Sequence, residues 1–536
     1  MLPLVFFCLI LGFAVGLVSI PIVREFARSR GLVDQPDRNR KLQDHAVALG
    51  GGIGVFASLV VAIVITLFVD RQFCGGVLGK VDLRYYHLFI AAAAILGVGL
   101  ADDLWTLRGR QKLLLQLVIV SALVTAGTKI THVGFFGIDF DLGIAAFPVT
   151  VLWLLVAVNA LNLIDGADGM ATTVGAIICV GLGWLSFERG GTMNAVACFA
   201  LAGSLFAFLV FNKPPATIYL GDAGSMMIGL FVGVLSVWTQ LKESTVLSSA
   251  PIAILAIPLF DSSAAILRRW LTGRSIYTTD RAHLHHLLQH RYGRTGMLFF
   301  VAMLSLVTTS LSVLSVYLNV PLLSAVGVLA VLLLLLVTKS FGIAEARLIA
   351  GRAAGFAKSM TVGPHRIELK SDNRPYRLQG VGNWDDVWEP LVSFAEKQGW
   401  AKIKIDVSMA WLHEGYHASY QMMRLPEKLE QISLSLPLFA TLSSDGRRVM
   451  IGRLSMIAAS HDQRACERLA MLGDYLRDLE PHLDRIVADI ETTDSVGSVA
   501  AKDDERPVDG SANGGIPARA APNAGSSTPI ELNTTI

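Results

Sequence analysis

Long apolar segments fill most of the first 340 residues of this 536-residue chain. Hydrophobic residues make up 53% of the sequence and charged residues only 16%, which is too apolar for an ordinary soluble protein of this length. Eleven segments approach or match the length of about 17–24 residues that crosses a bilayer core. They lie near residues 2–23, 49–70, 87–101, 112–130, 143–161, 169–187, 192–211, 223–240, 249–267, 297–317 and 320–338. The sequence therefore predicts an all-α polytopic membrane protein with eleven transmembrane helices.

Basic residues are distributed unevenly between these segments. If the N-terminus faces outward, the inside connections hold 16 Lys and Arg residues and the outside connections hold 6. The positive-inside rule favours this orientation. It predicts a multi-pass protein whose N-terminus is outside and whose acidic and histidine clusters, described below, all lie on the cytoplasmic face.

The composition changes after the transmembrane domain, residues 1–340. Residues 341–362 are expected to be a linker, and residues 363–490 alternate short apolar runs with polar turns before a long helical pattern. This pattern predicts a soluble cytoplasmic α+β domain. His413 and His417 have the i, i+4 spacing of some metal ligands, but their strand-like neighbours favour a structural role. Residues 491–536 are rich in Ala, Gly, Ser, Pro and Asp, which predicts a disordered tail.

Three acidic clusters interrupt the apolar region: GLADD at 99–103, NALNLIDGADG at 159–169 and YLGDAGS at 219–225. Carboxylates are costly at the edge of a bilayer, so these aspartates require an explanation. They are Asp102, Asp103, Asp165, Asp168 and Asp222. Because oxygen donors suit a hard cation such as Mg²⁺, a shared site for a divalent cation and phosphate fits best.

Each cluster also has a structural interpretation. Asp102 and Asp103 could simply pair with the basic residues that follow them, although Lys112 also suits a phosphate. Asp222 is expected at the start of a helix, where it is either an N-cap or a metal ligand, and taken singly the N-cap is favoured.

The central cluster is the most informative of the three. Asn159, Asn162 and Asp165 are spaced three residues apart and could share one helix face. An Asx-rich helix end is the alternative, but so many polar groups at membrane depth favour a ligand site. Asp168 lies in the glycine-containing loop that follows.

A histidine cluster, DRAHLHH at 280–286, follows the acidic ones and contains Arg281, His283, His285 and His286. Histidines with arginines can bind a diphosphate or donate to sugar hydroxyls. Zinc is the competing interpretation, but the nearby arginines disfavour a cation. Asp261 lies inside the ninth predicted span, where it could organise the histidine loop or contact a ligand directly.

The motifs in this order resemble those of the polyprenyl-phosphate N-acetylhexosamine-1-phosphate transferases. The matching stretches are RKLQDHAVALGGG at 40–52, ADD with Lys112, NALNLIDGADG, YLGDAGS, PLFDSSAAILRR at 258–269 and DRAHLHH. The resemblance covers roughly residues 1–340, and the histidine segment is similar to the branch that makes polyprenyl-diphospho-N-acetylglucosamine. AVALGGG departs from this branch, whose members commonly carry a proline before the glycines. Residues 363–490 have no counterpart in the minimal enzymes of the family.

The resemblance implies transfer of N-acetylglucosamine 1-phosphate from UDP-N-acetylglucosamine to undecaprenyl (polyprenyl) phosphate, with release of UMP. This would be the first membrane step of cell-envelope polysaccharide synthesis, at the cell inner membrane. Mg²⁺, with Mn²⁺ as the alternative ion, would be held by Asp222 and by Asn162 or Asp165. Asp102 or Asp103 would accept a proton from the lipid phosphate or orient it. The implied substrate-binding residues are Lys112, Asn159, Asn162, Asp168, Arg281, His283, His285 and His286.

Several alternatives stay open. The donor could be another UDP-N-acetylhexosamine or the muramoyl-pentapeptide nucleotide. For the mechanism, direct attack by the lipid phosphate is favoured over a covalent aspartyl intermediate. A transporter would more often show paired repeats with broken helices near the midplane. A membrane scaffold would leave the acidic motifs unexplained. The bilayer is an expected partner and nucleic acid is not, while a homodimer and a cytoplasmic partner for residues 363–490 are left open.

Overall fold

The computed structural model describes most of the chain. The described residues are 2–34, 46–135, 138–239, 246–247, 249–272, 283–338, 376–379, 382–409, 412, 414–421, 431–443, 446–459 and 465–503. Arg281, His413 and the predicted linker lie outside them. The helical part up to residue 338 and the sheet-containing part from residue 376 are described separately.

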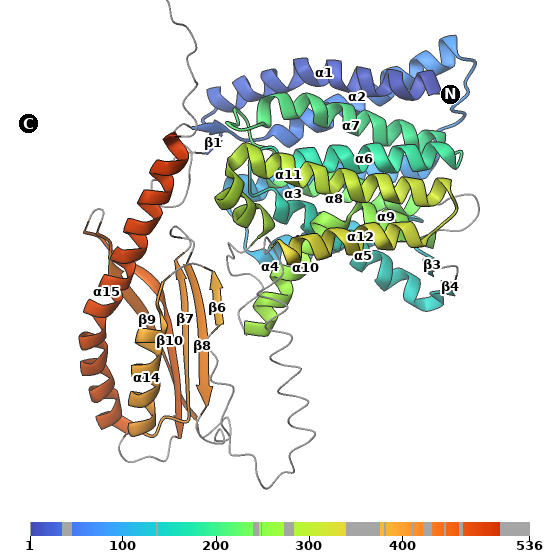
Figure 1. Ribbon diagram of the computed structural model, residues 1–536. Helices are drawn as coiled ribbons and strands as arrows, with labels where there is room; N and C mark the ends of the chain where they lie inside the picture. The colour runs from blue at the N-terminus through green and yellow to red at the C-terminus, as the bar shows by residue number, and fades with distance from the viewer. Residues whose placement is uncertain are drawn as a thin grey trace, which may run out of the picture. The chain divides into compact units, whose positions relative to one another are not determined.

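The first part is a bundle of helices (Figure 1). Its helices are α1 (Leu2–Ser29), α2 (Gly51–Phe73), α3 (Leu83–Trp105), α4 (Gly109–Thr125), α5 (Ala146–Ile164), α6 (Met170–Glu188), α7 (Thr192–Asn212), α8 (Gly221–Trp238), α9 (Ser249–Ile254), α10 (Ala256–Thr272), α11 (Leu284–Tyr317) and α12 (Leu322–Val337), with a short 3₁₀ turn at Gly143–Ala145. Within the described residues, eight helices are long and apolar enough to cross a membrane. The chain is therefore a polytopic membrane protein.

Three of the eleven predicted spans are helical but shorter than expected. The segment at 112–130 corresponds to α4 with 17 residues, and the segment at 320–338 corresponds to α12 with 16 residues. The segment at 249–267 is divided between α9 and α10. Pro258 explains this break, because it has no N–H to donate to the carbonyl of Ile254, where α9 ends.

Helix α8 lies at the centre of the bundle, and every residue from Ala223 to Trp238 is buried. Helices α2, α3, α5 and α6 pack against it. The outer helices expose apolar side chains instead, for example Ile10, Val18 and Ile90, which are 62%, 64% and 68% exposed. Such side chains can face lipid because they are apolar, and the helices that carry them pair most of their backbone polar groups internally.

Short strands connect the helices. The strands β1 (Val33–Asp34) and β2 (Val47–Ala48) pair in antiparallel fashion, and Ala48 also bridges to Ile218 just before α8. A separate three-stranded sheet contains β3 (His132–Phe135), β4 (Ile138–Asp141) and β5 (Val246–Leu247).

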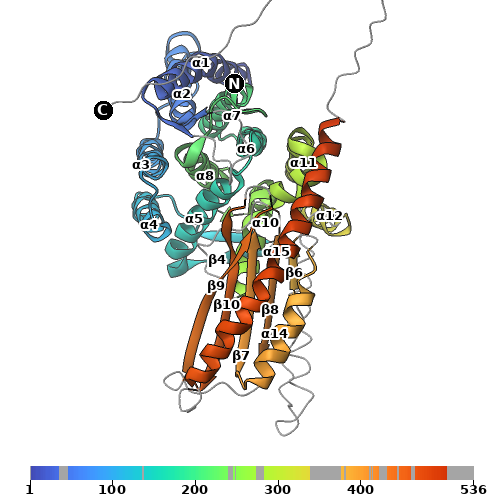
Figure 2. The same ribbon diagram turned by 90° about the vertical axis from the view of Figure 1, so that its left-hand side faces the viewer.

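The second part is a five-stranded antiparallel sheet with two helices on one face (Figure 2). Its elements are β6 (Tyr376–Gln379), α14 (Asp385–Lys397), β7 (Lys402–Met409), β8 (Glu414–Gln421), β9 (Gln431–Thr441), β10 (Arg448–Ala459) and α15 (Ala465–Asp503), and the strand order is β6-β8-β7-β10-β9. Alternate residues of β7, such as Ile403 and Ile405, are buried and join a core with Trp384 and Trp400. This arrangement agrees with the predicted α+β class.

Helix α15 continues to Asp503, past residue 490, the predicted end of the α+β domain. Adding one residue to an existing helix costs little, and the Ala, Val and Ser residues of this stretch permit it. Residues 504–536 lie outside the described residues.

Candidate active site

Asp102 lies in the last turn of α3 and forms the turn into α4. Its Oδ1 accepts a hydrogen bond from the backbone N–H of Leu107 at 2.7 Å, across Thr106, which has a positive φ of 48°. Its Oδ2 accepts a hydrogen bond from Lys112 Nζ at 3.0 Å. One carboxylate therefore fixes the turn and binds the lysine of the next helix.

Asp103, the adjacent residue, binds backbone instead. Its Oδ1 accepts a hydrogen bond from the N–H of Asp222 at 3.0 Å, and its Oδ2 accepts one from Ala223 at 3.4 Å. These N–H groups belong to the first turn of α8, where intrahelical acceptors are missing. Gly221 has a φ of 72°, and a Cβ there would lie 2.5 Å from Asp103 Oδ2. Asp103 thus caps α8, which is the structural role that the sequence offered for Asp222.

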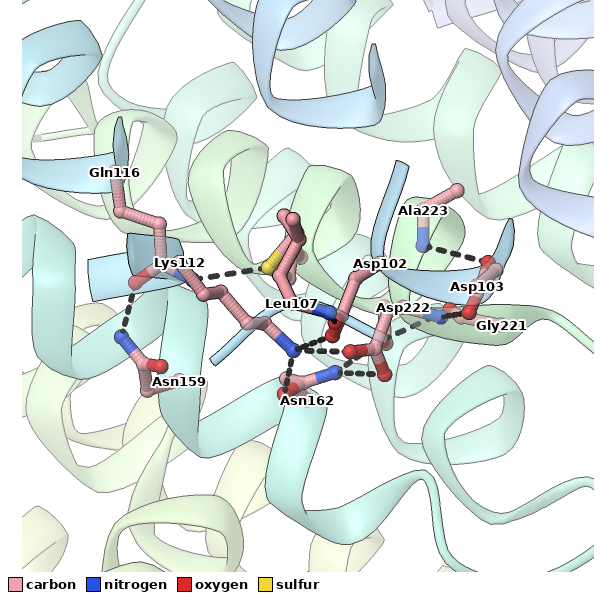
Figure 3. A network of polar contacts seen from close by, with 12 residues as sticks. Asp102, Asp103, Leu107, Lys112, Gln116, Asn159, Asn162, Gly221, Asp222 and Ala223 are labelled. Carbon is pink, nitrogen blue, oxygen red and sulfur yellow. Dashed lines mark hydrogen bonds and ion pairs between the residues drawn. The ribbon is translucent and has the colours of Figure 1, made fainter. Parts of the chain in front are cut away.

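Asp222 is available for other contacts because Asp103 caps the helix (Figure 3). The Asp222 carboxylate accepts hydrogen bonds from Lys112 Nζ and, at 2.8 Å, from Asn162 Nδ2. Lys112 Nζ also donates to Asn162 Oδ1 at 3.2 Å. We call Asp102, Lys112, Asn162 and Asp222 the Asp222 cluster. Four side chains from α3, α4, α5 and α8 thus meet at one end of the bundle.

Asn159 does not join the Asp222 cluster, although the sequence placed it on the same helix face as Asn162. Its Nδ2 donates to Gln116 Oε1 at 2.8 Å and to the carbonyl of Leu155 at 2.8 Å. Gln116 is fully buried and belongs to α4. Three residues of an α-helix turn by about 300° and rise by about 4.5 Å, so the side chain of Asn159 does not lie beside that of Asn162. Asn159 links α5 to Gln116 of α4 instead.

Asp165 follows the end of α5 and has an uncompensated carboxyl group. No described residue gives it a hydrogen bond or an ion pair. Burial, together with the nearby carboxylates of Asp222, Asp103 and Asp168, raises the pKa of Asp165 well above its usual value. A positive ligand would relieve this repulsion.

Asp168 lies in the loop between α5 and α6 and holds the loop that precedes α8. Its Oδ2 accepts a hydrogen bond from the N–H of Ala216 at 3.2 Å. Asn212 supports the same region, because its Oδ1 accepts from Gly169 at 3.1 Å and its Nδ2 donates to the carbonyl of Ile218 at 3.0 Å. Sequence analysis missed Asn212. The polar residue at the end of an apolar span was the available signal.

The glycines of the AVALGGG segment position the Asp222 loop. The backbone N–H groups of Gly51 and Gly52 donate to the carbonyls of Tyr219 and Leu220 at 3.0 and 3.1 Å. A Cβ on Gly52 would lie 2.4 Å from the Cα of Gly224. The backbones of α2 and α8 can therefore approach this closely only without a side chain at residue 52.

The histidine segment, His283–His286, lies at the start of α11. The rings of His283 and His285 stack with centroids 5.6 Å apart, and those of His285 and His286 are 4.2 Å apart. His285 is 2% exposed, and neither ring nitrogen has a hydrogen-bond partner among the described residues. Burial lowers the pKa of His285 to about 4, so the ring is neutral at physiological pH. A Cβ on Gly166 would lie 2.5 Å from His285 Nε2, so this segment packs against the Asp165 loop.

The donor atoms suit a divalent cation. The Lys112 ammonium is already bound by oxygens of Asp102, Asn162 and Asp222, and such oxygens are also the ligands of hard cations. Asp165 adds a carboxylate whose charge no described residue balances. No group of three or more His, Cys, Asp and Glu side chains among the described residues is arranged around a metal position, so a cation here would also need the Asn162 amide or the phosphates of a ligand.

Sequence comparison with known proteins covers the helices that carry these residues. The family model described as glycosyl transferase family 4 matches residues 85–240, which run from α3 to α8. A protein of Bacillus subtilis (strain 168), named probable undecaprenyl-phosphate N-acetylglucosaminyl 1-phosphate transferase, is 32% identical over 287 residues, which are 52% of this chain and 77% of that protein. The chain belongs to glycosyl transferase family 4.

Two further relatives of this family-4 chain have similar names. A Yersinia pestis protein named undecaprenyl-phosphate alpha-N-acetylglucosaminyl 1-phosphate transferase is 30% identical over 305 residues, covering 55% of this chain and 79% of the relative. A Mycobacterium tuberculosis (strain ATCC 25618 / H37Rv) protein is named decaprenyl-phosphate N-acetylglucosaminephosphotransferase. It is 32% identical over 307 residues, which cover 52% of this chain and 75% of that protein. The family membership predicted from the combined motifs is confirmed.

The family-model match contains all three acidic clusters and ends before the histidine segment. Within it, the structure brings Asp102, Lys112, Asn162 and Asp222 into direct contact. Asp165 and Asp168 lie in the adjoining loop, Asp103 caps α8, and Asn159 bonds to Gln116. Arg281 lies outside the described residues.

Proposed function

We propose that this family-4 protein transfers N-acetylglucosamine 1-phosphate from UDP-N-acetylglucosamine to undecaprenyl (polyprenyl) phosphate. The observation that carries the proposal is the Asp222 cluster, which places two carboxylates, an amide and a lysine at one end of the bundle (Figure 3). The names of the relatives support the same donor and acceptor class. Cell-envelope polysaccharide synthesis at the cell inner membrane follows as the setting.

The proposed reaction is a single phosphoryl transfer. A phosphate oxygen of the lipid attacks the β-phosphorus of the nucleotide sugar, and the bond from that phosphorus to the bridging oxygen breaks. UMP leaves with the bridging oxygen, while the sugar stays bonded to the β-phosphate, now part of a lipid diphosphate. Such a reaction depends on positioning and on neutralisation of charge more than on covalent chemistry by the protein.

Lys112 and Asp102 are the residues proposed to prepare the acceptor. The Lys112 ammonium would bind a phosphate oxygen and offset its negative charge. Asp102, which holds Lys112 at 3.0 Å, would orient the lysine and accept a proton from the lipid phosphate. Because the second pKa of a phosphate monoester is about 6, much of the acceptor is already ionised at neutral pH, and a proton acceptor adds little.

Asp222, Asp165 and Asn162 are the residues proposed to hold Mg²⁺, or Mn²⁺ in its place. Their oxygens fit a hard cation, and Asp165 lacks any other partner within the described residues. The ion would supply charge neutralisation at the donor diphosphate and at the departing UMP. Asp103 keeps Asp222 in place through the backbone of α8.

The donor is proposed to lie beside the Asp165 loop and the histidine segment, which pack against each other. His285 lies against Gly166, so groups on the histidine segment face the acidic loop. Asp168 would lie near the uridine, and His283, His285 and His286 with Arg281 would bind the sugar and the diphosphate. The active site and residues 363–490 are proposed to face the cytoplasm, with the N-terminus outside.

The test is UMP release by the purified full-length protein with undecaprenyl phosphate and Mg²⁺. UDP-N-acetylglucosamine, UDP-N-acetylgalactosamine and the muramoyl-pentapeptide nucleotide are compared as donors, and Asp222→Ala is the inactive control. Release with the first donor and not with the control is the expected result. Release with a different donor would keep the reaction and change the substrate. Absence of release with every donor would overturn the proposed function.

A further inference from the structure

Asp261 is a buried carboxylate in α10 that contacts the histidine segment. Its side chain is 0% exposed. Oδ1 accepts a hydrogen bond from the backbone N–H of Leu284 at 2.7 Å, and Oδ2 bonds His283 Nδ1 at 3.0 Å. A carboxylate in such surroundings needs partners, because leaving it unpaired is costly. Asp261 therefore caps α11 and holds His283 with its two oxygens.

The contact fixes the protonation pattern of the His283 ring. An ionised carboxylate can only accept hydrogen bonds, so the proton of a neutral His283 lies on Nδ1. No described residue bonds the other nitrogen, Nε2. That atom remains available to a ligand, either as an acceptor in the neutral ring or as a donor in the charged one.

The orientation of His283 also determines that of its neighbours. Its ring stacks on His285, which lies between His283 and His286 and against Gly166 of the acidic loop. A rotation of the His283 ring would thus disturb a stack that ends at the loop carrying Asp165. Asp261 is 22 residues earlier in the chain and belongs to a different helix from this stack.

We propose that Asp261 is a positioning residue, which holds His283 with the proton on Nδ1 and directs Nε2 toward the sugar diphosphate. The inference rests on the proposed function for the identity of that ligand. At metal sites, carboxylate–histidine pairs set the tautomer and ring orientation, and loss of such a partner typically costs about 10–100-fold in metal affinity or activity. Asp261 itself does not touch the substrate in this account.

Asp261→Asn is the first test variant. The amide oxygen can still accept from Leu284 and cap α11, but the amide nitrogen can only donate to Nδ1, which moves the ring proton to Nε2. We expect kcat/KM to fall about 10–100-fold while the melting temperature stays within about 2 °C of the wild type. Ser262→Ala is the matched control, because Ser262 is a buried neighbour on α10 whose hydroxyl bonds no described residue.

His283→Asn is the second variant and keeps the test valid if Asp261→Asn folds poorly. The asparagine amide can still donate to Asp261, but it lacks an equivalent of Nε2. We expect it to fold normally and to lose activity about as strongly as Asp261→Asn. The double variant should lose little more than either single one. Additive losses would contradict the proposal, because they would mean that Asp261 acts independently of His283.

The tautomer of His283 can be determined by NMR spectroscopy, without an activity assay. In protein labelled with ¹⁵N-histidine, the wild type should contain a histidine protonated on Nδ1 that disappears in His283→Asn and becomes Nε2-protonated in Asp261→Asn. An unchanged tautomer in Asp261→Asn would overturn the proposal. If the wild type releases no UMP, the proposed function fails, while this spectroscopic result still decides whether Asp261 positions His283.

Discussion

Asp103 accepts a hydrogen bond from the backbone N–H of Asp222 at 3.0 Å, although 119 residues separate the two. The neighbouring Asp102 instead binds Lys112 through its side chain. Two adjacent aspartates therefore have different functions: one sets the position of α8, and the other belongs to the Asp222 cluster. The distinction follows from their places on α3, since consecutive helical residues point about 100° apart.

Replacing these two aspartates by asparagine should separate their functions. Asp103→Asn keeps one oxygen that can accept from the N–H of Asp222 and loses only the longer bond from Ala223. We expect it to retain activity within about tenfold of the wild type. Asp102→Asn weakens the contact that orients Lys112, and we expect a loss of about 100-fold in kcat because small misplacements of reacting groups are costly. Steady-state kinetics of the two variants make the comparison. Equal losses would contradict the assignment.

Gly52→Ala should move the Asp222 loop. The added Cβ would lie 2.4 Å from the Cα of Gly224, so α2 and α8 must separate. We expect lower thermal stability and activity reduced by at least about tenfold, since small misplacements of reacting groups are costly. Gly97→Ala is the control, because a Cβ there meets no atom within 4 Å. Similar behaviour of the two variants would show that the close approach is unimportant.

The sequence singled out polar residues that the structure brings together, but not the contacts that they form. Acidic residues are costly at the ends of apolar spans, and the combination of the motifs singled out Asp102, Asn162 and Asp222 before their contacts were known. Pairwise contacts could not be predicted, because they depend on how distant helices pack. For this reason the sequence did not show that Asp103 caps α8 or that Asn159 bonds to Gln116.

The number of long helices was overestimated for a similar physical reason. Hydropathy alone does not detect the break at Leu255 that divides α9 from α10. The C-terminal α+β class could be predicted from alternating apolar residues, as in β7. The strand order could not, since the pairing of β7 with β10 joins segments that are far apart in the chain.

Asp165→Asn should stabilise the metal-free protein while reducing its activity. The pKa of Asp165 is raised, so the folded protein favours the protonated carboxyl and is weakened when this group ionises. The stabilisation relative to wild type should be absent below about pH 4 and should grow as the pH rises above it. We expect a melting temperature higher by about 1–3 °C at pH 7.5. Thermal unfolding across this pH range, without added metal, provides the measurement.

The control compares the melting temperatures of the wild type and Asp165→Asn with and without added Mg²⁺. The ion should raise the melting temperature of the wild type more than that of Asp165→Asn, because a bound cation offsets the charge that the variant lacks. An identical response of the two proteins would argue against Asp165 as a ligand.

Lys112→Met should increase the affinity of the substrate-free protein for Mn²⁺. The Lys112 ammonium is bound by the same oxygens of Asp102, Asn162 and Asp222 that suit a cation, so lysine and metal compete for them. We expect an increase of about tenfold in affinity, together with loss of transferase activity because the phosphate contact is gone. Mn²⁺ titration followed by electron paramagnetic resonance measures the first effect. Unchanged or weaker binding would mean that the metal lies elsewhere.

The central claim is that sugar and β-phosphate move together to the lipid at the Asp222 cluster. The most direct measurement uses UDP-N-acetylglucosamine labelled in both the sugar and the β-phosphorus, with the full-length protein, undecaprenyl phosphate and Mg²⁺. We predict that both labels enter the lipid in equal amounts, matched by released UMP, and that Asp222→Ala prevents all three. Transfer of the sugar label alone, with release of UDP, or unchanged transfer by the variant, would contradict the account.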